Sequence, residues 1–165
     1  MPIAKKLAKF LSKIKYEPIE HRTVYTAYDK AQTLKIPEKT VGKTLVMKMN
    51  GDFAIVLVSA NQILDKVKFK KTVNSWRKKL GQKSVKEIRF ATEVWMKKNL
   101  KGVKIGAIPP FGNLWRFPTF VEKSLLKNPT IIANAGDYNV SIKINSNLFK
   151  KLIPDLAVGN FGKKK

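Results

Sequence analysis

Residues 44–59 read TLVMKMNGDFAIVLVS, two apolar runs separated by the dipeptide Asn50-Gly51. Asn-Gly suits the left-handed backbone of a two-residue hairpin turn, so the pattern predicts antiparallel strands over residues 44–48 and 52–59. The second run has no polar alternation between Val56 and Val58, which is typical of a strand covered on both faces. The sequence therefore predicts a hairpin with a buried second strand.

Towards the N-terminus, an apolar stripe at three- and four-residue steps predicts a helix within residues 1–15, with lysines over the rest of its surface. A basic amphipathic helix of this kind suits a membrane surface or a transit peptide, but it more often packs its stripe on the core, as we expect here. The stripe consists of Ile3, Leu7, Phe10, Leu11 and Ile14.

The rest of the chain mixes expected strands with expected helices. Strands are predicted over residues 23–25, 85–90, 117–121, 131–134 and 140–144. Helices are predicted over residues 26–34 (capped by Thr26), 66–80, 91–99 and 148–153. With one clear hairpin and no regular βαβ repeat, this pattern indicates an α+β (mixed α/β) fold. We find no linker, so a single domain is expected over residues 1–165, ending in a frayed basic tail at residues 162–165.

The charge balance is far from neutral, because 34 Lys and Arg residues face 11 Asp and Glu residues, a formal net charge of +23. A surface this positive repels itself, so nucleic acid is the first expected partner and an anionic membrane the second. Residues 66–86 contain no acid and nine bases. The inner face of the helix expected there consists of Val67, Val73, Trp76 and Leu80.

Several chemistries are excluded by composition. Without cysteine there is no disulfide, thiolate nucleophile or Cys-ligated metal, and the single histidine, His21, excludes a His-rich metal site. There is no Gly-x-Ser-x-Gly elbow, and residues 41–44 lack the upstream glycine of a phosphate-binding loop. The longest apolar run, residues 53–58, is far shorter than the roughly 20 residues of a membrane span. With no visible signal peptide, we expect a soluble, cytoplasmic protein that needs no membrane.

Two features remain as candidates for chemistry. Lys43 stands at the head of a strand between apolar neighbours, a position compatible with an amine at the rim of a pocket, although a lysine that enters a strand is more often an ordinary solvated side chain. Residues 105–112 read IGAIPPFG, in which Gly106 allows a close backbone approach and the prolines keep the loop stiff. Backbone N–H groups of such a loop can donate to a developing oxyanion, although composition alone favours the simpler interpretation as a tight connection.

Four segments of the chain, in their order and spacing, resemble the YbaK-type aminoacyl-tRNA deacylases, which also occur as the editing domain of some prolyl-tRNA synthetases. The similarity extends from about residue 16 to residue 161. The four segments are Glu20-His21 with residues 24–27 (VYTA), residues 42–46 (GKTLV), residues 106–112 (GAIPPFG) and residues 134–136 (NAG).

The resemblance implies a mixed β-sheet or barrel flanked by helices, and hydrolysis by water, without a cofactor or metal, of the ester that joins a wrong amino acid to tRNA. It places Lys43 on the terminal-nucleotide phosphate or the carbonyl region, and the N–H groups of Gly106 and Ala107 on the ester carbonyl; Lys43 as a base is the second option. Lys43 and the loop should then face each other across a cleft. The expected substrate-binding residues are His21 (alternatively a structural histidine), Thr26, Thr44, Ile108, Pro110, Asn134 and Gly136.

The expected partner is the acceptor end of a tRNA, with a prolyl-tRNA synthetase as a further partner and the protein itself a monomer. Small amino acids such as Ala, Ser or Cys are the expected cargo, because synthetase pockets discriminate poorly among them. Asn134-Ala135 stands where the family commonly has Ser-Gly or Gly-Gly, so an inactive tRNA-binding or synthetase-associated module of the same fold is the alternative. The expected tRNA-backbone contacts are Lys66, Lys68, Lys70, Lys71, Arg77, Lys78 and Lys79.

Overall fold

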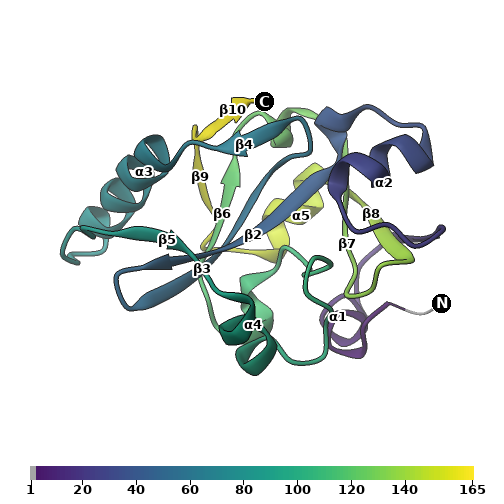
Figure 1. Ribbon diagram of the computed structural model, residues 1–165, viewed down its shortest axis with the longest axis horizontal. Helices are drawn as coiled ribbons and strands as arrows, with labels where there is room; N and C mark the ends of the chain where they lie inside the picture. The colour runs from purple at the N-terminus through teal and green to yellow at the C-terminus, as the bar shows by residue number, and fades with distance from the viewer. Residues whose placement is uncertain (1–2) are drawn as a thin grey trace.

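The computed structural model describes residues 3–165, and the predicted hairpin runs through the middle of the molecule (Figure 1). Strand β2 (Gly42–Met49) pairs along its length with the antiparallel β3 (Asp52–Ser59), and Asn50 takes the positive φ of 57° that the turn requires. Residues 54–60 of the second strand and its end are buried, which confirms that β3 is covered on both faces. The sheet around this hairpin has the order β5-β2-β3-β6-β9, with β5 (Ile88–Phe90), β6 (Thr119–Glu122) and β9 (Ala157–Gly159).

A second sheet closes against the start of the hairpin. Its order is β1-β8-β7, with β1 (Glu17–Glu20), β8 (Val140–Asn145) and β7 (Thr130–Asn134). A parallel bridge between Val41 and Ile132 joins β7 to the residue before β2, so the two sheets curve into a barrel-like wall. The main core lies inside this wall, where side chains of β3, β6, β7 and β8 pack around Phe111 from the predicted loop. The α+β, barrel-like architecture is confirmed.

The C-terminal residues form a strand instead of the frayed tail expected for residues 162–165. Strand β10 (Gly162–Lys164) pairs antiparallel with β4 (Gln62–Leu64). The buried carboxylate of Glu122 holds this end, because it accepts hydrogen bonds from the backbone N–H groups of Phe161 and Gly162. Burial acts to raise the pKa of Glu122, but the N–H groups of Gly162, Ser124 and Phe161 outweigh it and hold that pKa below its ordinary value.

Five α-helices flank the sheets in the described part of the chain: α1 (Lys5–Phe10), α2 (Ala27–Leu34), α3 (Lys66–Lys79), α4 (Glu93–Asn99) and α5 (Ser146–Leu152). Short 3-10 turns lie at Glu38–Thr40, Gly112–Trp115 and Leu125–Lys127. The expected stripe of α1 packs on the main core through buried Leu7 and Leu11, as predicted, while residues 1–2 of the expected helix lie outside the described range. No helix among residues 3–165 is both long and apolar enough to span a membrane.

Two local predictions are wrong. Residues 23–25 form no strand; the backbone N–H groups of His21 and Val24 bond the carbonyls of Asn139 and Tyr138 in an irregular connection, and the strand lies earlier, in β1. The inner face expected for α3 is wrong in part, because Val73 and Trp76 pack inward as expected but Val67 and Leu80 do not. Phe69 and Val73 are buried, whereas Val67 and Leu80 are 68% and 55% exposed.

Candidate active site

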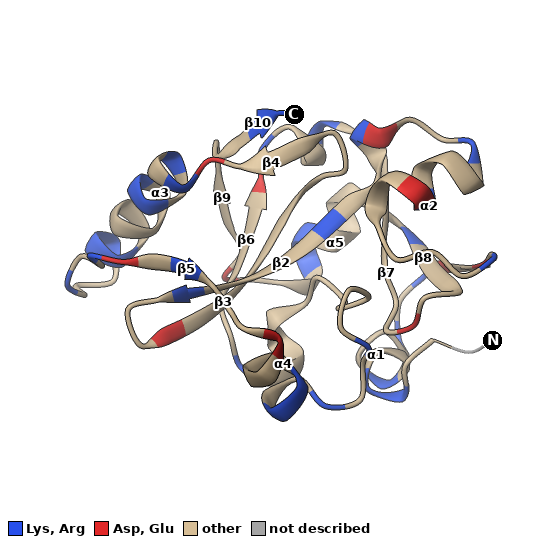
Figure 2. Cartoon of the chain, viewed as in Figure 1, with Lys and Arg blue, Asp and Glu red and all other residues tan. Residues whose placement is uncertain are grey.

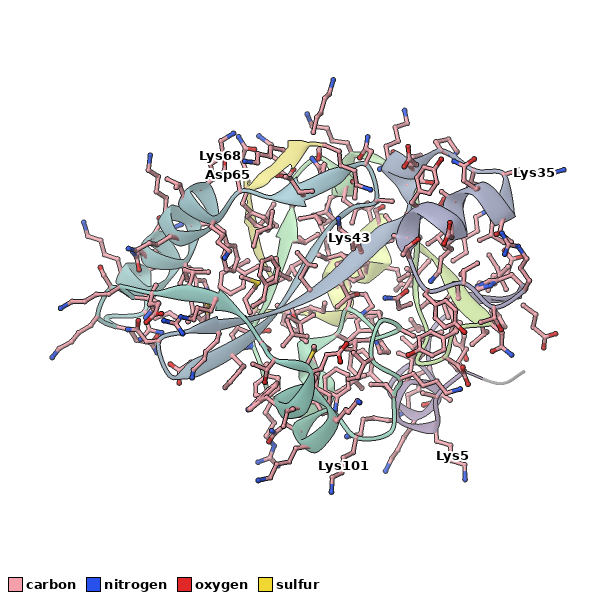
Figure 3. The ribbon with its side chains drawn as sticks, in the orientation of Figure 1. Lys5, Lys35, Lys43, Asp65, Lys68 and Lys101 are labelled. Carbon is pink, nitrogen blue, oxygen red and sulfur yellow. The ribbon has the colours of Figure 1, made fainter. Side chains whose placement is uncertain are left out.

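Lys43 is the second residue of β2, and its side chain is half-buried. Its Nζ donates to the carbonyl of Gln62, at the start of β4, over 2.6 Å. Burial first, and then the charge of Lys165, lower the pKa of this amine. Figure 3 shows Lys43 within the middle of the molecule, whereas Lys5, Lys35 and Lys101 extend outward from its surface. Among residues 3–165, no carboxylate forms an ion pair with Lys43. Its ammonium group is therefore able to bind an anionic or carbonyl oxygen of a ligand.

Asn134 lies on the same face of the wall as Lys43. The parallel bridge pairs Val41 with Ile132, and side chains two residues further along each strand point to the same side, which places Lys43 and Asn134 on one face. The amide of Asn134 donates from Nδ2 to the Ile108 carbonyl, 3.3 Å away, in the glycine-proline loop. Asn134 therefore links the loop to the strand beside Lys43, at the position where the chain departs from the family pattern.

Lys30 of α2 is a site residue that the sequence reasoning missed. Its side chain is only 5% exposed, and Nζ donates to Oδ1 of Asn134 over 2.6 Å. Desolvation lowers the pKa of this amine to about 8. A signal was present, because Lys30 lies three residues after Ala27 and four before Leu34, on the stripe of α2 that was expected to face inward.

His21 lies near this pair, bonded to the residue that neighbours Asn134 in the sheet. Its Nδ1 donates to the carbonyl of Arg22 over 2.8 Å, which leaves Nε2 to accept from the hydroxyl of Ser141 over 2.9 Å. Ser141 is the register partner of Asn134, so the two side chains share a face. Burial lowers the pKa of His21, the Arg22 carbonyl opposes that shift, and the charge of Lys30 adds to it. The neutral imidazole is thus held in one tautomer at neutral pH.

The glycine-proline loop is fixed at both ends. Gly106 has a φ of 90°, a conformation suited to glycine, and a Cβ at Gly112 would collide with the carbonyl of Phe117. The N–H of Ala107 donates to the Lys104 carbonyl over 3.0 Å, while the carbonyl of Ala107 accepts from Gly136 over 2.9 Å. Of the two N–H groups expected at the ester carbonyl, that of Ala107 is therefore occupied. The N–H of Gly106 has no hydrogen-bond partner within the described chain, and Gly106 is exposed.

The predicted site residues do not all meet. Thr44 points to the opposite side of β2 from Lys43, with its hydroxyl buried and unpaired. The hydroxyl of Thr26 caps α2 by accepting from Asp29, as predicted, and is thereby engaged. Ile108 and Pro110 are buried in the loop, with Ile108 packed against Val46. Gly136 has the positive φ of 98° and is buried beneath the loop.

The cleft expected between Lys43 and the loop is not evident. Among residues 3–165, no hydrogen bond or ion pair joins Lys43 to residues 105–112; Asn134, which shares a face with Lys43, bonds the Ile108 carbonyl of the loop. None of four well-formed hollows on the described surface is lined by Lys43. The largest of these four, about 510 Å³, lies beside the loop between α4 and Tyr138.

The basic helix α3 lies at the far end of the molecule from α2, and Figure 2 shows its concentration of Lys and Arg. Asp65 caps it by accepting from the N–H groups of Val67 and Lys68, and the helix follows directly on β4, which carries the acceptor of Lys43. Arg77 is engaged with Asp52 at 3.3 Å, and Lys70 with the carbonyl of Lys86. The exposed bases are Lys66, Lys68, Lys71, Lys78 and Lys79.

Comparison with known proteins agrees with this description. Residues 21–152 match the family model of the aminoacyl-tRNA editing domain. No curated protein matches the chain significantly. A solved structure described as a candidate trans-editing enzyme for prolyl-tRNA synthetase superposes with a TM-score of 0.79 at 22% identity, over 99% of this chain and 98% of that one. The hypothetical protein APE2540 superposes with a TM-score of 0.79 at 16% identity, over 96% of this chain and all of that one.

At these identities the structural likeness shows the fold, while the family match spans well over half of the chain. The match covers three of the four resembling segments entirely and includes Lys43, Lys30 and Asn134. The chain therefore belongs to the family of aminoacyl-tRNA editing domains.

Proposed function

We propose that the protein is an aminoacyl-tRNA deacylase that acts in trans and removes a small amino acid, such as Ala, Ser or Cys, from a mischarged tRNA. The observation that carries this proposal is the half-buried ammonium of Lys43, which has only a backbone carbonyl as partner and shares a face with Asn134. The similar solved structure described as a candidate trans-editing enzyme supports action in trans.

The protein needs to supply few chemical groups for this reaction, because an aminoacyl ester is already activated and water is the nucleophile. In our proposal Lys43 releases the Gln62 carbonyl and binds the terminal-nucleotide phosphate or the carbonyl region of the substrate. The unpaired N–H of Gly106 then donates to the ester carbonyl as its oxygen gains charge. Lys43 as a general base is the second option, which its lowered pKa favours.

Deacylation by the purified protein should be measured on tRNAs charged with Ala, Ser, Cys and Pro. We expect at least one of the three small amino acids to be released well above the spontaneous rate, with the charged prolyl-tRNA spared. If none of the four is released while uncharged tRNA still binds, the protein is the inactive tRNA-binding module of the same fold.

The positive surface of α3 should make tRNA binding strongly salt-dependent. If about five phosphates are contacted, the logarithm of affinity should fall against the logarithm of salt with a slope of roughly −3 to −5. Replacing Lys68 and Lys71 by Ala should reduce that slope by about 1 to 2. Replacing Lys13 and Lys15, exposed after α1, removes equal charge and should change it less. If the two double replacements change the slope equally, tRNA does not bind specifically at α3.

A further inference from the structure

An exposed tyrosine, Tyr25, packs against the half-buried Tyr138 beside the glycine-proline loop. Tyr25, which precedes α2, is 67% exposed, and its ring centroid lies 4.8 Å from that of Tyr138 in an edge-on arrangement. The hydroxyl of Tyr138 donates to the carbonyl of Ile105, which fixes its ring on the loop. A large aromatic side chain held in place and left exposed is suited to stack on a planar ligand.

The tyrosine pair adjoins the backbone group that we assign to the ester. A Cβ placed on Gly106 would lie 3.5 Å from Cε1 of Tyr138 and 3.8 Å from the carbonyl oxygen of Tyr25. The Tyr25 ring contacts the Tyr138 ring, which in turn adjoins Gly106, so a planar group stacked on Tyr25 would lie on the side of the loop that carries Gly106. This places the aromatic surface next to the reacting end of a bound substrate.

A positively charged hollow continues from Tyr138. Its volume is about 510 Å³, and exposed lysines of α4 and the following loop lie along it. Lys104 is paired with Asp137 at 2.9 Å and lies 5.4 Å above the Tyr138 ring. Lys97 and Lys101 have no carboxylate partner in residues 3–165, so both remain available to phosphate groups.

We propose that Tyr25 and the adjoining hollow bind the single-stranded 3′ end of tRNA, with a base stacked on Tyr25 and backbone phosphates at Lys97 and Lys101. Proteins bind unpaired RNA by stacking bases on aromatic rings beside a basic groove, and this surface combines both features. The inference rests on the proposed function, because the 3′ end must pass Gly106 for its ester to be hydrolysed. It is distinct from α3, whose lysines offer charge without an exposed aromatic platform at the loop.

The test compares binding of an uncharged tRNA with that of the same tRNA lacking its unpaired 3′ nucleotides. Replacing Tyr25 by Ala should weaken binding of the full-length tRNA about 10-fold and leave binding of the shortened tRNA unchanged. Tyr25→Phe keeps the ring and should bind as the unaltered protein does. Tyr28→Ala is the matched control, because Tyr28 is 49% exposed on α2 and its ring lies beside Lys165 at the other end of the chain, and it should change neither affinity.

Replacing Lys97 and Lys101 together by Ala should lower the salt slope by about 1 to 2 for the full-length tRNA only. The inference is overturned if Tyr25→Ala binds both tRNAs as tightly as the unaltered protein, or if it weakens both equally. Because binding of uncharged tRNA requires no hydrolysis, failure of the proposed function is seen separately, as absent deacylation with the Tyr25 effect intact. Should the Tyr25→Ala variant fold poorly, the Lys97 and Lys101 double variant supplies the comparison, since an unchanged salt slope, or a slope lowered equally for both tRNAs, would also contradict the inference.

Discussion

Replacing Lys43 by Ala is expected to slow ester hydrolysis by about 100- to 1,000-fold, the loss typical of removing one preorganised group from a transition state. The side chain is half-buried and its single hydrogen bond is to the Gln62 carbonyl, so we expect the fold to survive the substitution. The measurement is single-turnover deacylation of the best substrate, with thermal unfolding as the check on folding. Equal rates in both proteins would remove Lys43 from the mechanism.

A second substitution separates the two roles considered for this amine. Arginine keeps the positive charge but does not give up its proton near neutral pH. If Lys43 anchors a phosphate or carbonyl, Lys43→Arg should retain much of the activity; if it is the general base, the arginine variant should be as slow as the alanine variant. Lys48→Ala is the matched control, because Lys48 lies on the same strand with an exposed side chain.

Lys30 is expected to make the free energy of unfolding depend on pH. The folded protein holds the pKa of Lys30 at about 8, against an ordinary value of 10.5. Between these values the unfolded chain binds more protons than the folded one, so the stability contribution of this group rises with pH. Below about pH 8 both states are protonated, and the full penalty for burying the charge, about 3 kcal/mol, is present.

Replacing Lys30 by Met removes this titration and leaves Oδ1 of Asn134 without a donor. We expect the stability of the unaltered protein, relative to the variant, to increase by about 2 to 3 kcal/mol between pH 7 and pH 10, because the other lysines contribute equally to both proteins. Urea unfolding at the two pH values measures this difference. Lys35→Met, at an exposed position after α2, should show no such change. A difference that does not vary with pH would mean that Lys30 titrates as an ordinary lysine.

The strongly local features of the fold were predictable from sequence. Asn50-Gly51 fixes its own turn, and the hydroxyl of Thr26 caps α2 with the N–H of Asp29, three residues away. The prolines and glycines of residues 101–112 likewise predicted a loop without regular structure, and that loop plugs one end of the main core through Phe111. In each case the interactions that determine the local structure join residues only a few positions apart in the sequence, so the prediction needed no knowledge of tertiary contacts.

The features that depend on distant partners were not predictable. Strand β10 exists because Glu122, some forty residues earlier, accepts from its backbone, and no local pattern at residues 162–164 reveals this. The N–H of Ala107 donates to the Lys104 carbonyl in a turn that the composition of the loop does not predict. Lys43 could be selected from its motif, but the face of the sheet that it occupies depends on strand register. Thr44 points away from it for a local reason, because neighbouring residues of a strand lie on opposite faces.

The face of α3 shows the same limit. Val73 was correctly expected in the core, but spacing allowed Phe69 beside it as readily as Val67 or Leu80. Only the position of Phe120 and Phe161 decides that Phe69 is the buried one. Lys30 was overlooked for a related reason. A lysine on an inward stripe is ordinarily taken as a side chain that reaches solvent, and its burial becomes visible only once Asn134 is seen to receive it.

The anchoring of β10 has a practical consequence for anyone who produces the protein. Gln62 of β4 pairs with Lys164 in the strand register and also accepts from Lys43, while Lys165 is near enough to influence that amine. A peptide fused after Lys165, such as a purification handle, would therefore emerge beside Lys43, where we propose that the substrate binds. Kinetic work should begin from material whose handle is elsewhere or has been removed, because otherwise a slow enzyme and an obstructed one would look alike.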